Sequence, residues 1–438
     1  MHRRAPYAFR VALIAVAAAA VTAAGLELAR RPNVAAAGGA VGDASAHPLA
    51  ESPHARGRTP ASPSPHRRVG ALPPGTINPV TVTPGNPSPH RGVDAWEPSP
   101  DGTSVAFLTP FSGGAALGPA TRVRWVDLRG AHAARWVQSV SGVSMAWTGD
   151  GTGFVCSTYG EARPFMDPEV RLVLYTPRDG RATVLTSGRD DCWPAWRSDG
   201  RVLAFVRVDW SRPLGAVDRT RVYVLHRLAG RFGMPEPIGQ THFVISRVLW
   251  RPFHSQIAYI EEACAEPSQQ QGDFRWDVVL VDAIHGQETR LTKVHDVGKA
   301  GLDFSPDGRR LVFVREPRAA LRKAGGVVEV LDVSRRRCRV LLSAADLGGG
   351  RVRVTDLRWS PAGDRIVVGA SVGPDWHCDI GIARWPSGRF VWLTRDGESR
   401  LPRWSHGGSR IRFVRGQNEL WEMRIDGTKC HMLRELPG

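Results

Sequence analysis

Histidines are the first residues whose chemistry could define a site, because neutral imidazole binds transition metals and titrates near neutral pH. Of the fourteen in the chain, those in the later segments are widely separated: His242, His254, His295, His377 and His406. They form no H-E-x-x-H motif and no other close metal-ligand spacing. A fold that gathers distant segments around an axis could still unite some of them. The spacing itself predicts no metal centre and no cofactor.

Adjacent carboxylates occur at Asp190–Asp191 and at Glu261–Glu262. General acid–base catalysis needs two carboxyl groups that face one substrate. Neighbouring residues on a strand point to opposite faces, so at most one carboxylate of each pair can face a common cavity. We therefore expect these pairs to supply charge at a rim, where Asp191 and Glu261 would orient a partner.

Nucleophilic catalysis finds no support, because the chain contains no G-x-S-x-G nucleophile elbow. The six cysteines are Cys156, Cys192, Cys264, Cys338, Cys378 and Cys430, and none has C-x-x-C spacing. If the protein is exported, Cys156 and Cys192 are the nearest plausible disulfide pair. The alternative is that most cysteines are small buried side chains.

The elements that must position these side chains repeat along the chain. An aromatic residue, a short polar turn and an alternating apolar run recur seven times, with anchors 45 to 55 positions apart at Trp96, Trp147, Trp196, Trp250, Phe304, Trp359 and Trp404. An all-β repeat of this period predicts blades arranged in a ring. We expect an all-β propeller of four-stranded antiparallel blades, seven by the motif count, with six as the alternative.

Turn chemistry explains why each hairpin forms. In the copy from Phe304 to Gly308, Pro306 presets the first corner, Asp307 can bond to the backbone that follows, and Gly308 takes the left-handed position without steric cost. The aromatic residue before each turn is expected to pack between adjacent blades, as core and not as a ligand cage.

The repeat resembles that of the TolB-like family, also called the WD40-like or PD40 repeat. Pro194 to Phe205, Phe304 to Phe313 and Pro402 to Phe413 carry the P-x-W-S-P-D-G pattern and its apolar strand, and Leu291-Thr292 and Leu393-Thr394 look like its outer-strand ending. The resemblance covers about four-fifths of the chain. It implies the fold and no single activity, since TolB itself has six blades and an extra α/β domain. Peptidases and metal-binding oligogalacturonate lyases share the repeat, but neither their nucleophile nor their ligand set can be matched here.

Three domains are predicted. Residues 1–31 read as a signal peptide or an N-terminal membrane anchor, because Arg3, Arg4 and Arg10 precede an apolar stretch from Val11 to Gly25. Residues 32–92 are rich in Pro, Ala, Gly and Ser and should form a disordered linker. Residues 93–437 are the propeller. Whether a short run at residues 77–82 completes its ring is left open. We expect an extracytoplasmic location, with a possible membrane tether.

The net charge of +16 does not indicate nucleic-acid binding. Arginine supplies nearly all the positive charge, and the arginines are scattered along the chain without an interleaved aromatic face. We expect a monomer whose partner is an envelope protein or a glycan.

Long connections between second and third strands provide the strongest indication of a binding face. They are predicted at Thr109–Thr121, Asp209–Thr220 and Ala263–Trp276. Such loops on a rigid scaffold often carry recognition. The residues predicted to contact the partner are Asp191, Trp210, Glu261, Arg275, Trp276 and Arg315. The leading hypothesis is a non-enzymatic exported propeller that binds a protein or glycan at this loop face. The alternative is a polysaccharide lyase or hydrolase with its site in the axial funnel.

Overall fold

The computed structural model describes residue 93 and residues 95–436, apart from residues 112–119, 131–134, 141–143, 160–169, 188–189, 210–218, 265–273, 317–325, 350–351 and 373–376. The predicted leader, the linker and the run at 77–82 lie outside the described residues. Among the described residues, no helix is long and apolar enough to cross a membrane.

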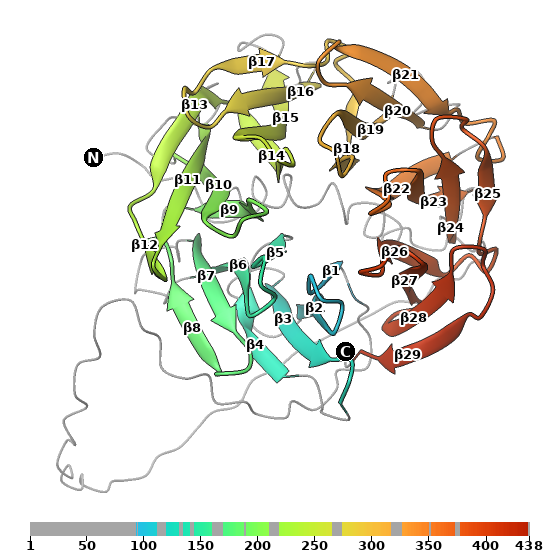
Figure 1. The fold of residues 1–438 in the computed structure, drawn as a ribbon, viewed down its shortest axis with the longest axis horizontal. Coiled ribbons are helices and arrows are strands. Elements are labelled where there is room, and N and C mark those ends of the chain that lie inside the picture. Colours follow the sequence, from blue (N-terminus) through green and yellow to red (C-terminus); the bar gives the residue numbers. More distant parts are fainter. Residues whose placement is uncertain are drawn as a thin grey trace, which may run out of the picture.

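Seven sheets stand around a central axis in chain order, and each is antiparallel (Figure 1). The inner strands are β1 (Ala95–Pro98), β5 (Met145–Trp147), β9 (Asp191–Trp196), β14 (Val244–Trp250), β18 (Val297–Phe304), β22 (Val352–Trp359) and β26 (Ser399–Trp404). The second strands are β2 (Ser104–Phe111), β6 (Phe154–Tyr159), β10 (Val202–Val208), β15 (Gln256–Cys264), β19 (Arg310–Arg315), β23 (Arg365–Val372) and β27 (Arg410–Arg415).

The third strands are β3 (Ala120–Asp127), β7 (Val170–Thr176), β11 (Thr220–Leu228), β16 (Phe274–Asp282), β20 (Val327–Asp332), β24 (His377–Arg384) and β28 (Glu419–Arg424). The outer strands are β4 (Arg135–Val140), β8 (Arg181–Val184), β13 (Glu236–His242), β17 (Glu288–Arg290), β21 (Arg337–Leu342), β25 (Phe390–Trp392) and β29 (His431–Glu435). A short extra strand, β12 (Arg231–Phe232), extends β11 in blade three. Seven blades are thus confirmed and the six-bladed alternative is wrong.

The two faces of the ring follow from this connectivity. Inner and second strands meet at the Pro-Asp-Gly turns, and third and outer strands meet at that same end, here called the turn face. Connections from second to third strands, and from each blade to the next, lie at the opposite end, here called the loop face. At the turn face, Gly308 has a φ of 65°, and a Cβ there would lie 2.6 Å from the Pro252 carbonyl oxygen. Only glycine therefore allows the turns of blades four and five to pack so closely.

The repeated tryptophans lie between blades, as predicted. The indole N–H of Trp147 donates to the Glu97 carbonyl of the preceding blade at 2.9 Å. Trp404 does the same to the Arg358 carbonyl at 3.1 Å. The indoles of Trp147 and Trp404 thus bury their rings in the core and satisfy their one polar atom on the neighbouring inner strand. Those of Trp196 and Trp359, in contrast, have no hydrogen-bond partner among the described residues.

Among the described strands, the ring closes without exchange between blades one and seven. Blade one consists of β1–β4 and blade seven of β26–β29, so each is continuous in sequence. The Val93 amide donates to the Gln417 carbonyl at 2.7 Å, and the Arg400 guanidinium donates to the Val93 and Gln417 carbonyls. The Trp96 indole donates to the Leu401 carbonyl at 3.0 Å. Side-chain and backbone contacts thus hold the joint that a shared sheet could have sealed.

Two sequence predictions require correction. Cys156 and Cys192 are both free, so the suggested disulfide is absent, and burial raises the pKa of each thiol. The long loops are also shorter than predicted, because strand pairing continues to the Cys264–Phe274 pair in blade four. The connection there covers only residues 265–273, and the strand β16 includes three residues assigned to the loop, Phe274, Arg275 and Trp276.

Candidate functional site: the axial channel

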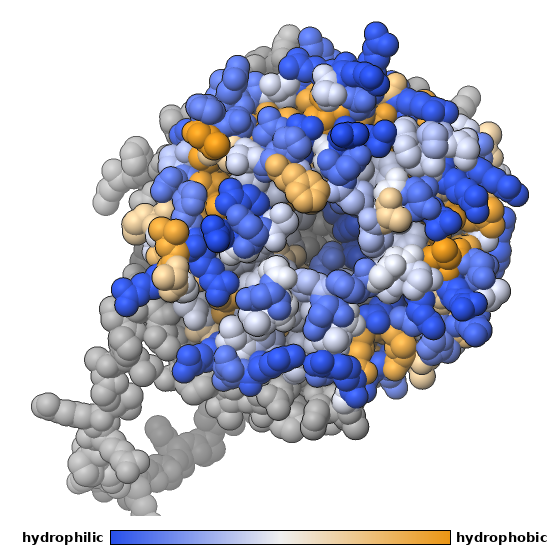
Figure 2. Space-filling view, in the orientation of Figure 1, coloured by the Kyte–Doolittle hydropathy of each residue, from blue (hydrophilic) through white to orange (hydrophobic). Residues whose placement is uncertain are grey.

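A channel of about 330 Å³ runs along the axis and is lined by residues of all seven inner strands. Figure 2 shows the ring hollowed at its centre, with hydrophilic residues visible on one side of the hollow. The inner strands differ in sequence from blade to blade, so the channel wall is uneven although the scaffold is regular.

Bulges in the inner strands aim large side chains at this channel. The pairing register shifts in β9, β14 and β26. At these shifts Trp193, Arg247 and Leu401 have φ values of 54°, 56° and 54°. Bulky residues seldom adopt this left-handed conformation, and strained positions of this kind cluster at functional sites. All three line the channel.

One arc of the wall is charged and spans the ring joint. Arg403 of blade seven contacts Glu97 of blade one at 2.9 Å and also pairs with Asp356 of blade six. Arg358 binds the other Asp356 oxygen at 2.9 Å. Burial would raise the pKa of Asp356, but the neighbouring guanidinium groups lower it, so the carboxylate is charged.

Two further channel groups are less well compensated. Burial raises the pKa of Asp303 to about 6, although the charge of Arg358 opposes this shift. One oxygen of Asp303 accepts the Trp359 backbone N–H at 2.8 Å. Burial also lowers the pKa of Arg247 to about 10, and the charge of Arg358 adds to that effect. Burial therefore disfavours the charged form of Asp303 and of Arg247.

The opposite arc is apolar and aromatic. It comes from blades two and three and is lined by Met145, Ala146, Trp147, Trp193, Pro194, Ala195 and Trp196. A ligand in the channel would meet an uncharged, mainly apolar wall on one side and hydrogen-bonding charge on the other. Such a pairing suits a ligand with both apolar faces and hydroxyl or ionic groups.

No group of three or more His, Cys, Asp or Glu side chains in the described part of the chain could hold a metal ion. The chemistry available in the channel is that of carboxylates and guanidinium groups. Asp303 is the channel acid able to hold a proton near neutral pH.

The predicted contact residues lie elsewhere. Asp191, Glu261 and Arg315 all lie at the loop face, as the sequence placed them, but each is already paired. Asp191 and Arg315 pair within their own blades, and Glu261 pairs with Arg290 of its own blade and with a histidine of blade three. Asp191 is fully buried and binds Arg207 at 2.6 Å, while Arg315 binds Asp296 at 3.0 Å. Trp276 is half-buried on β16, only the backbone of Arg275 is described, and Trp210 lies outside the described residues.

Sequence reasoning missed the network around Glu261. His242, at the end of β13, reaches into blade four and contacts Glu261 at 2.9 Å, Glu288 at 3.2 Å and the Tyr259 hydroxyl at 3.0 Å. Burial alone would lower the pKa of His242, but hydrogen bonds and the two carboxylates raise it to about 9. A charged imidazole therefore joins blades three and four. The sequence feature that could have indicated this network is a histidine at a blade-to-blade junction, followed by the carboxylate pair Glu261–Glu262.

No protein-family model and no curated protein matches the chain. Solved structures do resemble it. The β-propeller domain of the trilobed protease from Pyrococcus furiosus, described as having an open velcro topology, superposes with a TM-score of 0.56 at 11% identity, covering 80% of this chain and 99% of that one.

An oligogalacturonate lyase in complex with manganese gives a TM-score of 0.53 at 15% identity, covering 75% of this chain and 87% of that one. TolB from Acinetobacter baumannii gives 0.39 at 16% identity, covering 64% and 68%. Since these identities are so low, the comparisons show a β-propeller fold and nothing about activity. The likeness to TolB-like repeats is confirmed only at the level of the propeller.

Proposed function

We propose that the protein is an exported, non-enzymatic propeller that binds an envelope protein or glycan and takes part of that partner into its axial channel. Export is supported by the basic and apolar N-terminal residues of the sequence. The observation that carries the binding role is the left-handed backbone at Trp193, Arg247 and Leu401. A fold that needed only a filled centre would have no cause to retain three strained residues there.

Within this role, the two arcs favour a sugar unit over a peptide side chain. An apolar wall suits the carbon-bound faces of a sugar, while carboxylates and guanidinium groups can bond to its hydroxyls. The loop face above the channel would then contact the rest of the partner. Its charges at Asp191, Glu261 and Arg315 support the rim itself, because they are paired within the blades.

The test compares Asp303→Asn with Asp179→Asn, an exposed turn residue of blade two, in full-length protein. The side-chain amide oxygen of D303N would still accept the Trp359 N–H, so the fold is kept and only the channel charge is removed. Binding to an envelope glycan array should weaken about tenfold in D303N and remain unchanged in D179N. If deletion of residues 265–273 abolishes binding while D303N leaves it intact, the channel is not the site.

A second candidate is a polysaccharide hydrolase or lyase with Asp303 as its general acid. The pKa of about 6 favours this role, since a general acid must hold its proton near the working pH. New reducing or unsaturated sugar ends in glycan incubated with wild-type protein, absent with D303N, would support the enzyme. Bound glycan recovered intact would support the binding protein.

A further inference from the structure

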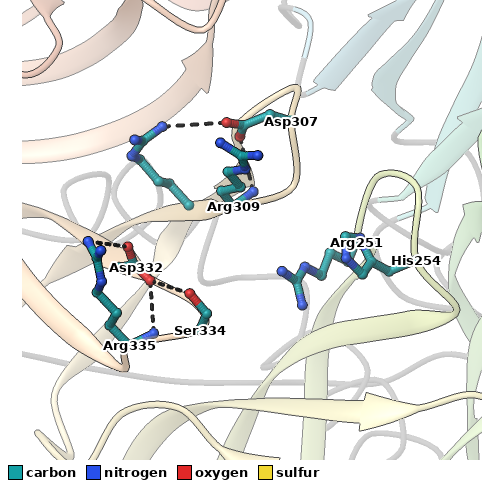
Figure 3. A pocket seen from close by; sticks show the side chains of 8 residues that line it. Arg251, His254, Asp307, Arg309, Asp332, Ser334 and Arg335 are labelled. Carbon is teal, nitrogen blue, oxygen red and sulfur yellow. Dashed lines mark hydrogen bonds and ion pairs between the residues drawn. The ribbon is translucent and has the colours of Figure 1, made fainter.

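A second cavity lies on the turn face between blades four and five. It shares no lining residue with the axial channel. It has a volume of about 550 Å³. Three turns form it: the first turn of blade four, the first turn of blade five and the outer turn of blade five. Its lining residues are Arg251, His254, Asp307, Arg309, Arg310, Asp332, Ser334 and Arg335, and Figure 3 shows most of them facing a common space.

Arg251 is fixed at the wall of this cleft. Its guanidinium donates to the Gly308 carbonyl at 2.7 Å and to the Gln256 side-chain oxygen at 2.7 Å. In the described part of the chain, no carboxylate lies within ion-pair distance of Arg251. Burial lowers its pKa below the usual value. The cleft thus holds a positioned cation whose protein partners are neutral, and Figure 3 shows it pointing into the open space.

The two aspartates neutralise the cleft only in part. Asp307 accepts the Ser305 hydroxyl at 2.5 Å and the Arg309 amide at 3.0 Å. Asp332 likewise accepts the Ser334 hydroxyl at 2.9 Å and the Arg335 amide at 2.8 Å. These bonds stabilise the turns on which the aspartates lie, so their carboxylates are already engaged.

The charge balance follows from the lining. Four arginines against two aspartates leave two positive charges on the cleft wall. Arg310 reaches Asp307 at 3.5 Å and Arg335 reaches Asp332 at 3.8 Å, both long for charge-assisted hydrogen bonds. Arg309 forms no ion pair with any described residue and is exposed. Guanidinium groups therefore remain available to a ligand.

We propose that this cleft binds the phosphate group of a small ligand or surface molecule. A phosphate monoester carries about 1.5 to 2 negative charges at neutral pH and offers three oxygens, which matches an excess of two positive charges on planar donors. The volume lies within the range for small-ligand sites. The site is separate from the axial channel, and its occupancy does not depend on the function proposed there.

The test titrates full-length protein with inorganic phosphate at constant ionic strength, using calorimetry, with chloride as the reference anion. Arg309→Gln and Arg335→Gln should each weaken phosphate binding about tenfold. Both side chains are exposed, so neither change threatens folding. Arg178→Gln, on the corresponding outer turn of blade two, is the matched control and should bind as wild type does.

The proposal is overturned by the absence of saturable phosphate binding. It is also overturned by equal losses in R178Q and R309Q, since equal losses mean a diffuse charge effect. A parallel arm adds vesicles of phosphatidylcholine with or without phosphatidylglycerol. Vesicle binding that inorganic phosphate displaces and R309Q weakens assigns the phosphate to a lipid headgroup. Phosphate binding without vesicle binding assigns it to a soluble or polymer-borne phosphate. Vesicle binding unaffected by R309Q, in the absence of phosphate saturation, also overturns the site.

Discussion

Arginines in the axial channel and arginines in the turn-face cleft show how one residue type can serve two purposes. In the channel, Arg403 is buried and pairs with carboxylates of two other blades. In the cleft, Arg251 bonds to a carbonyl and an amide, and Arg309 extends into solvent. Arg403 is thus paired within the protein and holds the ring joint together. The cleft arginines retain donors for a ligand. The two regions differ in the carboxylates that surround the arginines, and not in the arginines themselves.

The largest expected effect comes from Arg403→Gln, which tests whether the channel arginine stabilises the ring. The change leaves Asp356 buried beside a single remaining partner, so we expect a loss of about 3–5 kcal/mol in the free energy of unfolding, measured by urea denaturation. Arg424→Gln, an exposed change on β28, should cost less than about 0.5 kcal/mol. Equal losses in the two variants would show that the channel pairs do not close the ring.

The ion pairs of His242 with Glu261 and Glu288 stabilise the junction of blades three and four only while the imidazole is charged. His242 has its pKa raised from 6.5 to about 9, so its stabilising charge is fully present below pH 6.5 and is lost as the pH rises through 9. We expect wild type to lose about 2–3 kcal/mol across that interval relative to His242→Gln, measured as unfolding free energy against pH. His254→Gln, an exposed turn residue, should keep the wild-type slope. A slope retained in H242Q would assign it to another group.

Asp303 should respond to substitution in the opposite direction, because its charge destabilises the fold whereas that of His242 stabilises it. Its pKa is raised from 3.8 to about 6, so the folded state loses stability as the carboxyl ionises across this interval. Removing that charge with Asp303→Asn should stabilise the fold by about 1–2 kcal/mol at pH 7, less than the full shift because part of the side chain faces the channel water. Below pH 3.8 the variant and wild type should match. Thermal denaturation at both pH values checks this, with Asp179→Asn as the neutral control.

The smallest effect belongs to the cleft. Arg309→Gln should change the unfolding free energy by less than about 0.5 kcal/mol, because its guanidinium supports no buried group. The measurement is urea denaturation in phosphate-free buffer beside R403Q. A loss comparable to that of R403Q would mean that the cleft arginines are structural, and the contrast between the two regions would disappear.

The sequence predicted the ring well because its signals are local. Each Pro-Asp-Gly turn is formed by residues within a few positions of one another, as in the bonds of Ser305 and Arg309 to Asp307, and an aromatic anchor recurs at the same place in each repeat. Asp191, Glu261 and Arg315 were predicted at one rim from their place at the start of an inner strand or the end of a second strand, and they do lie at the loop face.

The site was not predictable in the same way. Trp193 and Arg247 reach the channel because a bulge shifts the strand register, and a one-residue shift changes the face to which a side chain points. The pairing of Glu97 with Arg403 joins residues about 300 positions apart, so no local pattern announces it. Strand ends were also misjudged, since Arg275 continues a ladder where a loop was expected.

The joint between blades one and seven has a mechanical meaning. The Val93 amide bonds to the Gln417 carbonyl, and the Leu436 amide bonds to the adjacent Asn418 carbonyl. Both ends of the propeller are thus moored to one hairpin bend of blade seven. A pull on residues 93 and 436 would therefore load this bend together with the other contacts across the joint, such as that of Trp96 with Leu401. Under such a load we expect the joint between blades one and seven to open before any other blade unfolds.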